Sequence, residues 1–141
     1  MYYSGCVLLG LSVGQLETSF GEYGKPLLKG ISFSVSHTET RDKNQFCVCS
    51  AYSTEHIQIG IDAALRNKPL GIPNVTKAEL LRRLKSNKSL GTRREWIQIE
   101  ENESENDQMN CFYRLWSIKE SILKATGKGA SGLIPSSIDI R

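Results

Sequence analysis

The length, composition and charge of the chain describe a single soluble domain. It has 141 residues, 39% of them apolar and 23% charged, and its 18 Lys and Arg residues against 15 Asp and Glu residues give a net charge of +3. A chain of this size can bury a core without a disulfide or a structural metal. The small positive excess is compatible with an anionic ligand and argues against a nucleic-acid partner, because nucleic-acid-binding proteins usually show a concentrated basic face.

The cysteine spacing does not indicate a zinc site, and the apolar N-terminus does not resemble a secretion signal. Cys47 and Cys49 alternate within an apolar run, so on a strand both side chains would point to the same face. No C-x-x-C pair is present, and the two histidines complete no zinc-like pattern. We therefore expect reduced thiols and a cytoplasmic protein. The apolar start lacks a basic segment, and no stretch is long enough to span a membrane.

The first half of the chain predicts a turn followed by three antiparallel strands. Residues 22–26 form the turn, with Lys25 at its tip. Strict alternation of apolar and polar residues then predicts strands over residues 31–37, 46–52 and 56–62. In the first of these, the apolar residues fall on one face and the serines on the other. In the third, Ile57, Ile59 and Ile61 are expected to point inward, and Asp62 ends the strand.

The second half predicts helices. Thr76 is expected to cap a helix over residues 77–84, and Thr92 a second, short helix that holds Trp96. Residues 100–107 are acidic and predict a solvated connection. The longest helix is expected over residues 110–126, where apolar side chains recur at helical spacing, and Gly127 should end it. Residues 136–140 alternate again and predict a last strand.

Several polar residues are candidates for chemistry, although each has a simpler structural interpretation. Glu120 and Lys124 are four apart and share a helix face, which is also the spacing of an ordinary surface ion pair. Asp62 can simply turn the chain after its strand. His37 alone is more often a hydrogen-bonded structural histidine, and Lys25 in a turn is usually just solvated.

Taken together and in order, these residues carry a resemblance to a known family. The blocks are Gly24-Lys25-Pro26, then residues 33–37 (F-S-V-S-H), then residues 59–62 (I-G-I-D), and finally residues 112–129, which contain W-x-x-K-E-x-x-x-K-A and end in G-K-G. From about residue 20 to residue 141 the chain resembles the Sfp-like 4′-phosphopantetheinyl transferases. Within that family it is most similar to the fungal and animal enzymes that prime aminoadipate reductase.

The resemblance implies a fold and a reaction. The fold would be α+β, with an antiparallel sheet of three to four strands and a long helix packed on it, as one of two similar halves. Residues 24–141 would form this half, and residues 1–23 would be a remnant of the first half or a linker. The reaction would be magnesium-dependent transfer of 4′-phosphopantetheine from coenzyme A to a carrier serine, which leaves 3′,5′-ADP. The carrier would be an acyl carrier protein or an aminoadipate-reductase-type domain in lysine biosynthesis.

The resemblance also implies roles for particular residues. Asp62 and Glu120 would hold Mg²⁺, because this hard cation prefers carboxylate, phosphate and water oxygens. Glu120, or a water beside it, would take the proton of the carrier serine. Lys124 would pair with the pyrophosphate. The remaining contacts with coenzyme A would come from Lys25 and Pro26 at the adenosine end, Ser36 and His37 at the 3′-phosphate, and Lys119 as a general attraction for phosphate.

Two features depart from the family pattern. The family often has a third acid two residues after the aspartate of the G-I-D block, and here that position is Ala64. The chain is also short for a two-half enzyme. It could be a fragment of an active lineage, which we favour, a short transferase that self-associates, or a non-catalytic relative. The rival function is a module that binds coenzyme A or a carrier domain without catalysis.

Overall fold

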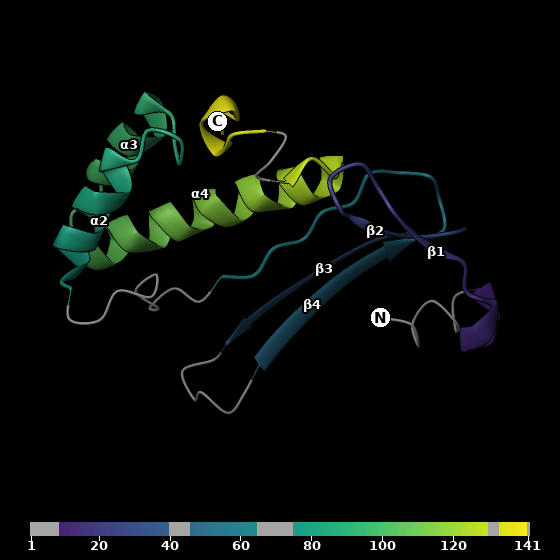
Figure 1. Cartoon of the computed structure of the whole chain (residues 1–141). Coiled ribbons are helices and arrows are strands. Elements are labelled where there is room, and N and C mark those ends of the chain that lie inside the picture. Colours follow the sequence, from purple (N-terminus) through teal and green to yellow (C-terminus); the bar gives the residue numbers. More distant parts are fainter. Residues whose placement is uncertain (1–8, 40–45, 65–74, 130–132, 141) are drawn as a thin grey trace.

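The computed structural model describes residues 9–39, 46–64, 75–129 and 133–140. In chain order the elements are η1 (Val13–Gln15), β1 (Thr18–Phe20), β2 (Pro26–Leu28), β3 (Ser32–Glu39), β4 (Phe46–Ser53), α2 (Lys77–Ser86), α3 (Arg93–Glu100), α4 (Glu105–Thr126) and η2 (Pro135–Ser137). Figure 1 shows the strands at one end, α2 and α3 at the other, and α4 running between them. The predicted α+β class is confirmed.

The first sheet is a short hairpin that the sequence analysis did not predict. β1 pairs antiparallel with β2, with Thr18 opposite Leu28. The predicted turn joins the two strands, and the Gly21 amide donates to the Lys25 carbonyl at 2.8 Å. Strands of three residues are too short to produce a recognisable alternation. The boundary that we expected between residues 23 and 24 falls inside this turn, so the hairpin spans both of the expected segments.

The second sheet is the predicted hairpin of β3 and β4, which pair antiparallel with Ser36 opposite Cys49. Phe33 of β3 and Ile31, which directly precedes the strand, are buried in a small core with Leu28. Ser34 and Ser36 lie on the other face of β3, and each is only 5% exposed. Serine is seldom fully buried unless its hydroxyl has a partner. Another part of the chain must therefore cover the serine face as well.

That cover is the segment 57–64, and the predicted third strand at residues 56–62 is wrong. The Ile61 amide donates to Ser34 Oγ at 3.1 Å, and the Ala63 amide donates to Ser36 Oγ at 3.2 Å. Because serine side chains project from the face of β3, the segment lies over the sheet and not beside its edge. Ile57, which we expected to point inward, is 50% exposed.

The segment 57–64 also touches α4, and Gly60 makes this contact possible. A Cβ atom at residue 60 would lie 1.7 Å from the Ser121 carbonyl oxygen and 2.5 Å from the Ala125 nitrogen. Only glycine can approach a helix backbone so closely. The segment is thus inserted between β3 and α4 (Figure 1). The described residues form two two-stranded sheets, so the prediction of one sheet of three to four strands is wrong.

The predicted helices are confirmed with small changes in their ends. Thr76 caps α2 by accepting from the Glu79 amide, and Thr92 forms a reciprocal capping box with Glu95 at the start of α3. α4 starts five residues earlier than expected, because Ser104 caps it and acidic residues in the first turn suit the positive end of a helix. It ends at Gly127, whose φ of 71° is left-handed, as predicted.

The main core lies between the three helices. Its aromatic centre is Phe112 of α4, whose ring lies 5.7 Å from that of Trp96 and 6.3 Å from that of Trp116. The other buried members are aliphatic or aromatic residues of the same helices, namely Leu80, Leu81, Leu84, Ile99, Met109, Tyr113 and Leu115. This core fixes the N-terminal part of α4 and leaves its C-terminal part to meet the strands.

An ion pair is buried beside this core, and it overturns one predicted role. Lys119 is 1% exposed, and its Nζ donates to Glu95 Oε2 at 2.5 Å and to the Pro135 carbonyl at 2.9 Å. Glu95 also accepts from the amides of Thr92 and Ile140. Lys119 therefore links α4 to α3 and to η2 inside the protein, and its buried ammonium is not accessible to a phosphate. The predicted strand at residues 136–140 is also wrong, because this region forms η2 and a coil.

We predict that Glu95→Gln lowers the free energy of unfolding by about 3 kcal/mol or more, because it leaves the charge of Lys119 buried without its counterion. Urea unfolding would measure the change. The matched control is Glu17→Gln, which breaks the exposed pair with Lys29 and should cost less than about 1 kcal/mol. The double change Glu95→Leu with Lys119→Met should recover much of the loss. Equal effects of the two Glu→Gln changes would contradict the role of the buried pair.

We also predict that Gly60→Ala lowers the free energy of unfolding by about 1–3 kcal/mol, because the added methyl group forces residues 57–64 away from α4. The control is Gly14→Ala, where an added Cβ would meet nothing within 4 Å. Urea unfolding of both variants would compare them. A Gly60→Ala variant as stable as the unchanged chain would show that the segment does not need this contact.

Candidate active site

A carboxylate, an ammonium and a hydroxyl converge where β3, residues 57–64 and α4 meet. The Lys124 Nζ donates to Asp62 Oδ1 at 2.6 Å and to Ser36 Oγ at 2.9 Å. Ser36 Oγ in turn lies 2.9 Å from Asp62 Oδ1 and donates to it. The Asp62 side chain is 10% exposed and that of Lys124 is 31% exposed. Each of the three groups is therefore hydrogen-bonded to the other two, and Lys124 is more exposed to solvent than Asp62.

The hydroxyl of Ser36 is fully used within this cluster. It donates to Asp62 and accepts from Lys124 and from the Ala63 amide. One donor and two acceptor positions are all that a hydroxyl has. Ser36 therefore positions Asp62, and a phosphate could bind to this hydroxyl only by displacing one of these partners. The predicted direct contact with the 3′-phosphate does not fit the hydrogen bonding of this residue.

Glu120 belongs to the same cluster electrostatically. It lies one helical turn before Lys124, so the two side chains share a face of α4. Burial raises the pKa of Glu120, the negative charge of Asp62 raises it further, and the Lys124 ammonium opposes both effects. Asp62, the first predicted metal ligand, is thus close enough to raise the pKa of Glu120, the second. Two such carboxylates repel one another unless a cation offsets them.

The donor set of this cluster suits magnesium. Mg²⁺ prefers oxygen ligands and is usually held by one or two carboxylates, with water and substrate phosphates completing the shell. Asp62 and Glu120 would supply those two carboxylates. Among the described residues no group of three or more His, Cys, Asp or Glu side chains could hold a metal ion. This agrees with Ala64 at the position where the family often has a third acid.

Lys25 lies at the end of α4, and its ammonium contacts protein carbonyls. Its Nζ donates to the carbonyls of Lys124 at 2.7 Å, Ile59 at 3.2 Å and Ala125 at 3.3 Å. Three bonds use all the protons of an ammonium, and partial burial lowers the pKa of Lys25. A cation also suits the negative end of a helix. Lys25 therefore ties residues 57–64 to α4 and does not present a free charge to a ligand.

Two other predicted residues lie outside the cluster. His37 is exposed, and its partner across the strands is Val48, which is 65% exposed. Because neighbouring residues of a strand point to opposite faces, His37 faces away from Ser36. Pro26 is exposed at the start of β2. The structure thus joins Asp62, Lys124 and Ser36 by hydrogen bonds and places Glu120 on the same face of α4 as Lys124. His37 and Lys119 lie apart from them.

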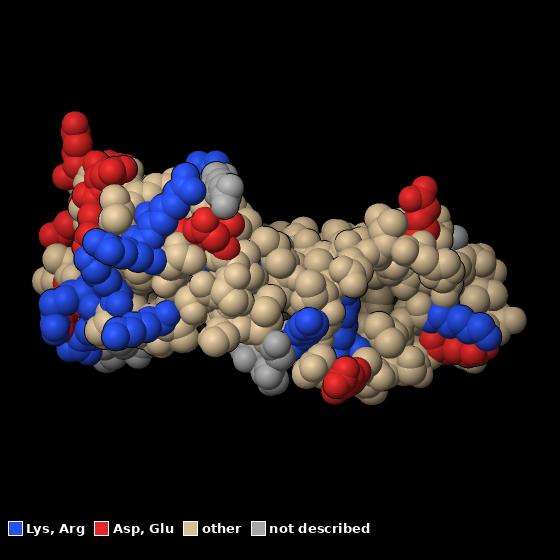
Figure 2. Space-filling view, turned by 90° about the horizontal axis from the view of Figure 1, so that it is seen from above, with Lys and Arg blue, Asp and Glu red and all other residues tan. Residues whose placement is uncertain are grey.

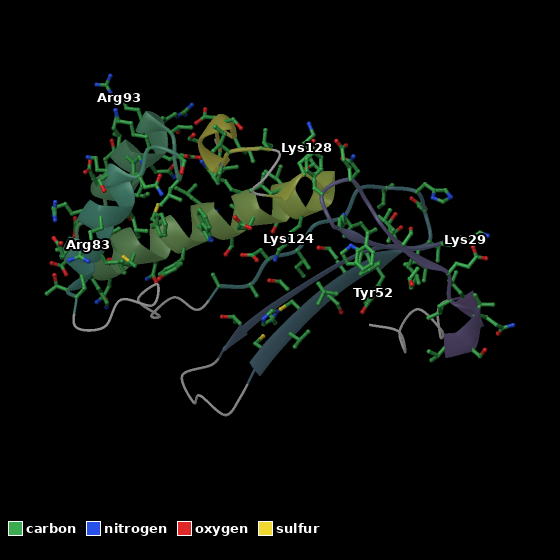
Figure 3. All side chains as sticks on the ribbon, in the orientation of Figure 1. Lys29, Tyr52, Arg83, Arg93, Lys124 and Lys128 are labelled. Atoms are coloured by element: carbon green, nitrogen blue, oxygen red, sulfur yellow. The ribbon has the colours of Figure 1, made fainter. Side chains whose placement is uncertain are left out.

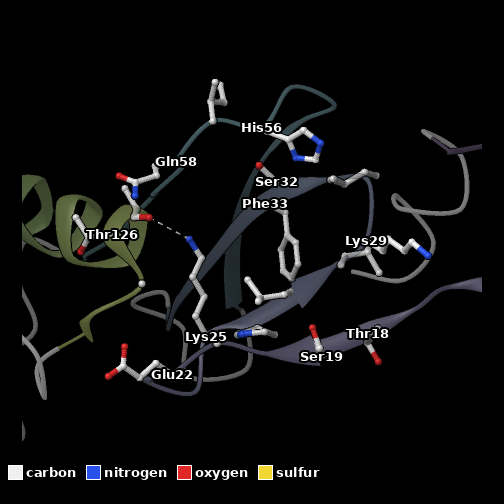
Figure 4. Close-up of a pocket in the computed structure, with 18 of the residues that line it drawn as sticks. Thr18, Ser19, Glu22, Lys25, Lys29, Ser32, Phe33, His56, Gln58 and Thr126 are labelled. Atoms are coloured by element: carbon white, nitrogen blue, oxygen red, sulfur yellow. Dashed lines mark hydrogen bonds between the residues drawn. The ribbon is translucent and has the colours of Figure 1, made fainter.

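Two hollows lie beside the hairpin of β1 and β2, and the smaller of them reaches Lys124 of the cluster. The smaller, of about 230 Å³, is lined by Ser34, Lys124 and residues of the G-K-P turn. The larger, of about 810 Å³, lies between the hairpin, residues 56–58 and the end of α4. Figure 4 shows Lys25 reaching across this cleft toward the end of α4. The sequence analysis assigned Lys25 and Pro26 to coenzyme A, but it gave no binding role to other lining residues such as Tyr23, Lys29, Gln58 and Lys128.

Charged side chains also gather far from this site, at the end formed by α2 and α3 (Figure 2). Positive and negative groups are mixed there. Hydrogen bonds from Arg82 and then Arg83 lower the pKa of Glu79 to about 2, and Lys85 pairs with Glu100. Figure 3 shows Arg83 at this end and Lys124 toward the strands. Much of the positive charge at the helical end is therefore offset locally.

In the part of the chain that the structure describes, no helix has the length and apolar character needed to cross a membrane.

Comparisons with known proteins place the chain in a family. The family model of the 4′-phosphopantetheinyl transferase superfamily matches residues 58–140. The 4′-phosphopantetheinyl transferase gsp of Aneurinibacillus migulanus is 31% identical over 109 residues, covering 77% of this chain and 37% of that protein. The enzyme HetI of a Nostoc species is 30% identical over 131 residues, covering 89% and 47%. Sfp of Bacillus subtilis is 28% identical over 124 residues, covering 86% and 46%.

The chain spans less than half the length of these curated relatives. The family match nevertheless covers more than half of the chain and includes Asp62, Glu120 and Lys124. The chain belongs to the 4′-phosphopantetheinyl transferase superfamily.

Proposed function

We propose that this chain carries the metal-binding half of an enzyme that transfers 4′-phosphopantetheine from coenzyme A to a serine of a carrier protein and releases 3′,5′-ADP. The observation that carries this proposal is the ion pair of Lys124 with Asp62, with Glu120 half-buried one turn before Lys124 on the same face of α4. Two carboxylates with an adjacent ammonium are suited to a cation and a pyrophosphate. The named relatives, which are 4′-phosphopantetheinyl transferases, support the same reaction.

The chemistry assigns a role to each member of the cluster. Mg²⁺, when bound, would neutralise charge on the pyrophosphate. Asp62 and Glu120 would hold it. Lys124 donates to Asp62 at 2.6 Å, and its partly exposed ammonium would bind an oxygen of the pyrophosphate. The serine of the carrier must lose its proton as it attacks phosphorus. The raised pKa of Glu120 suits a group that accepts this proton.

The surrounding structure supports a site for coenzyme A beside the cluster. The two hollows share Lys25, Pro26 and Phe33 with each other, and the smaller one reaches Lys124. The larger volume of about 810 Å³ lies in the range of pockets for nucleotide-sized ligands. We therefore place the adenosine end of coenzyme A against the G-K-P turn. In this proposal the backbone and Pro26 make the contacts, whereas the Lys25 ammonium holds the end of α4.

The acceptor is proposed more narrowly from the sequence resemblance. The blocks around Pro26, His37 and Glu120 resemble those of enzymes that prime aminoadipate reductase, so we propose a carrier domain of that type as the first acceptor to test. An acyl carrier protein is the second. A cytoplasmic location would fit either acceptor.

We expect Asp62→Asn and Glu120→Gln each to lower the transfer rate by about 100-fold or more, because one removes a ligand of the cation and the other also removes the base. The test uses the longest natural chain that contains this segment. Mass spectrometry of an apo carrier domain would follow transfer, with release of 3′,5′-ADP as a second readout. Glu103→Gln, an exposed carboxylate outside the cluster, is the control.

Two outcomes would overturn this proposal. Retained transfer in both cluster variants would exclude the assigned roles. Binding of coenzyme A by the unchanged chain, with no 3′,5′-ADP released when magnesium and apo carrier are present, would identify a binding module instead of an enzyme. Circular dichroism would show that the variants are folded.

The raised pKa of Glu120 predicts a pH-dependent effect on stability. A carboxyl whose pKa is higher in the folded state binds more protons there, so its contribution to stability falls as the pH rises through the interval between the unfolded and folded values. Glu120→Gln should therefore be more stable than the unchanged chain at pH 7, and this gain should vanish below about pH 4. Urea unfolding at several pH values would measure it.

Magnesium provides the matching control for this stability effect. It should raise the melting temperature of the unchanged chain at pH 7 more than that of Glu120→Gln, because it offsets the same repulsion. A Glu120→Gln variant that is less stable than the unchanged chain at pH 7 would contradict the electrostatic coupling of the two acids.

A further inference from the structure

A closely spaced pair of thiols lies on β4. Cys47 and Cys49 are two residues apart, so both side chains point to the same face of the strand. Their sulfur atoms are 3.9 Å apart. Cys47 is exposed and Cys49 is half-buried. The pair is therefore preorganised and accessible, and neither thiol has a place in the reaction proposed above.

The thiols face the same side of the sheet as the acidic cluster. Cys49 is directly opposite Ser36, and Cys47 is opposite Thr38. Directly opposite residues of paired strands share a face, and the hydroxyl of Ser36 donates to Asp62 on that face. A hydrogen bond with Cys47 raises the pKa of Cys49, and burial and the charge of Asp62 act in the same direction. The neutral thiols are therefore favoured while the site is empty, and a bound cation would have to displace their protons.

The geometry of the pair fits a shared metal ion better than a disulfide. A tetrahedral zinc ion with Zn–S bonds of about 2.3 Å holds its two sulfurs about 3.8 Å apart, close to the 3.9 Å observed. A disulfide needs its Cα atoms within about 6.8 Å. Residues two apart on an extended strand are already separated by about 6.7 Å. An ion can therefore bridge the sulfurs without moving the strand, whereas a disulfide bond would require Cα positions at the limit of its range.

We propose that Cys47 and Cys49 together bind a soft divalent metal ion of the zinc or cadmium class, in a site separate from the carboxylates proposed to hold magnesium. Each sulfur gives up its proton and becomes a thiolate ligand, so one ion replaces two protons. Thiolates select soft ions, and magnesium prefers oxygen. Since no third side chain completes a ligand group among the described residues, water or an added ligand fills the remaining positions.

This site has a consequence for the neighbouring cluster. An ion bound by two sulfurs on the face of Asp62 would act on the same negative charge that attracts magnesium. Soft ions would then inhibit phosphopantetheine transfer at concentrations well below that of magnesium. This consequence rests on the proposed function, whereas the binding of the ion does not.

The test is a titration of the full chain with Cd²⁺ in a background that carries Cys6→Ser and Cys111→Ser, so that only the pair remains. The sulfur-to-cadmium charge-transfer absorption in the ultraviolet reports thiolate ligation directly. We expect saturation at one ion per chain, with release of two protons. Adding Cys47→Ser or Cys49→Ser should weaken binding at least tenfold, because one ligand of a chelate is lost.

A second measurement on the unchanged chain does not depend on variants. Cd²⁺ should protect both Cys47 and Cys49 from iodoacetamide, as read by mass spectrometry of their shared peptide, and leave alkylation of Cys111 unaffected. Excess Mg²⁺ should not remove this protection. The proposal is wrong if the absorption is absent, if the single serine variants bind as tightly as the pair, or if protection is no greater at Cys47 and Cys49 than at Cys111.

Discussion

Two serine hydroxyls on one face of β3 hold residues 57–64 against the sheet, and the position of the candidate site depends on this contact. Ser34 and Ser36 accept hydrogen bonds from the amides of Ile61 and Ala63. Ser34 and Ser36 are two residues apart, and so are Ile61 and Ala63. The spacing of the hydroxyls along β3 therefore matches the spacing of every second amide along residues 57–64. Asp62 lies between the two bonded amides, which fixes where its carboxylate projects. On the opposite side of the segment, Gly60 allows α4 to approach, so Lys124 reaches the same point.

Lys25, Lys119 and Lys124 have different roles because their ammonium groups bind different partners. Lys119 and Lys124 are five residues apart on α4, which places them about 140° apart around the helix axis. One therefore points to Glu95 in the interior and the other to Asp62. Lys25 is distant in sequence, but it binds the last carbonyls of α4. Of the three, only Lys124 combines partial exposure with a place beside a carboxylate, which is the combination that a phosphate-binding lysine needs.

The candidate site holds one carboxyl that is not offset by an ion pair of its own. Burial and the Asp62 charge raise the pKa of Glu120 against the opposing effect of Lys124, so ionised Glu120 lowers the stability of the free protein. Functional sites commonly keep such strained charges, because a bound cation or substrate then gains the energy of relieving them. The network of Glu95 and Lys119 is the opposite case, since each charge there has its counterion and its hydrogen bonds. The first arrangement suits binding and the second suits stability.

The sequence alone determined the elements that have local signals, and it indicated Asp62 and Glu120 as the candidate acids. The helix ends at Thr76, Thr92 and Gly127 could be predicted from the sequence, because capping depends on residues only a few positions apart. The order of the motifs also indicated the family and paired Asp62 with Glu120. Tertiary structure decided the rest. Alternation at residues 56–62 predicts a strand equally well whether the backbone bonds to a neighbouring strand or to serine side chains, so the insertion of this segment could not be foreseen. Likewise, the sequence could not show that Lys119 would meet Glu95, Lys25 the end of α4 and Lys124 Asp62. The partners of Lys25 and Lys124 come from distant parts of the chain, and Glu95 lies on another helix.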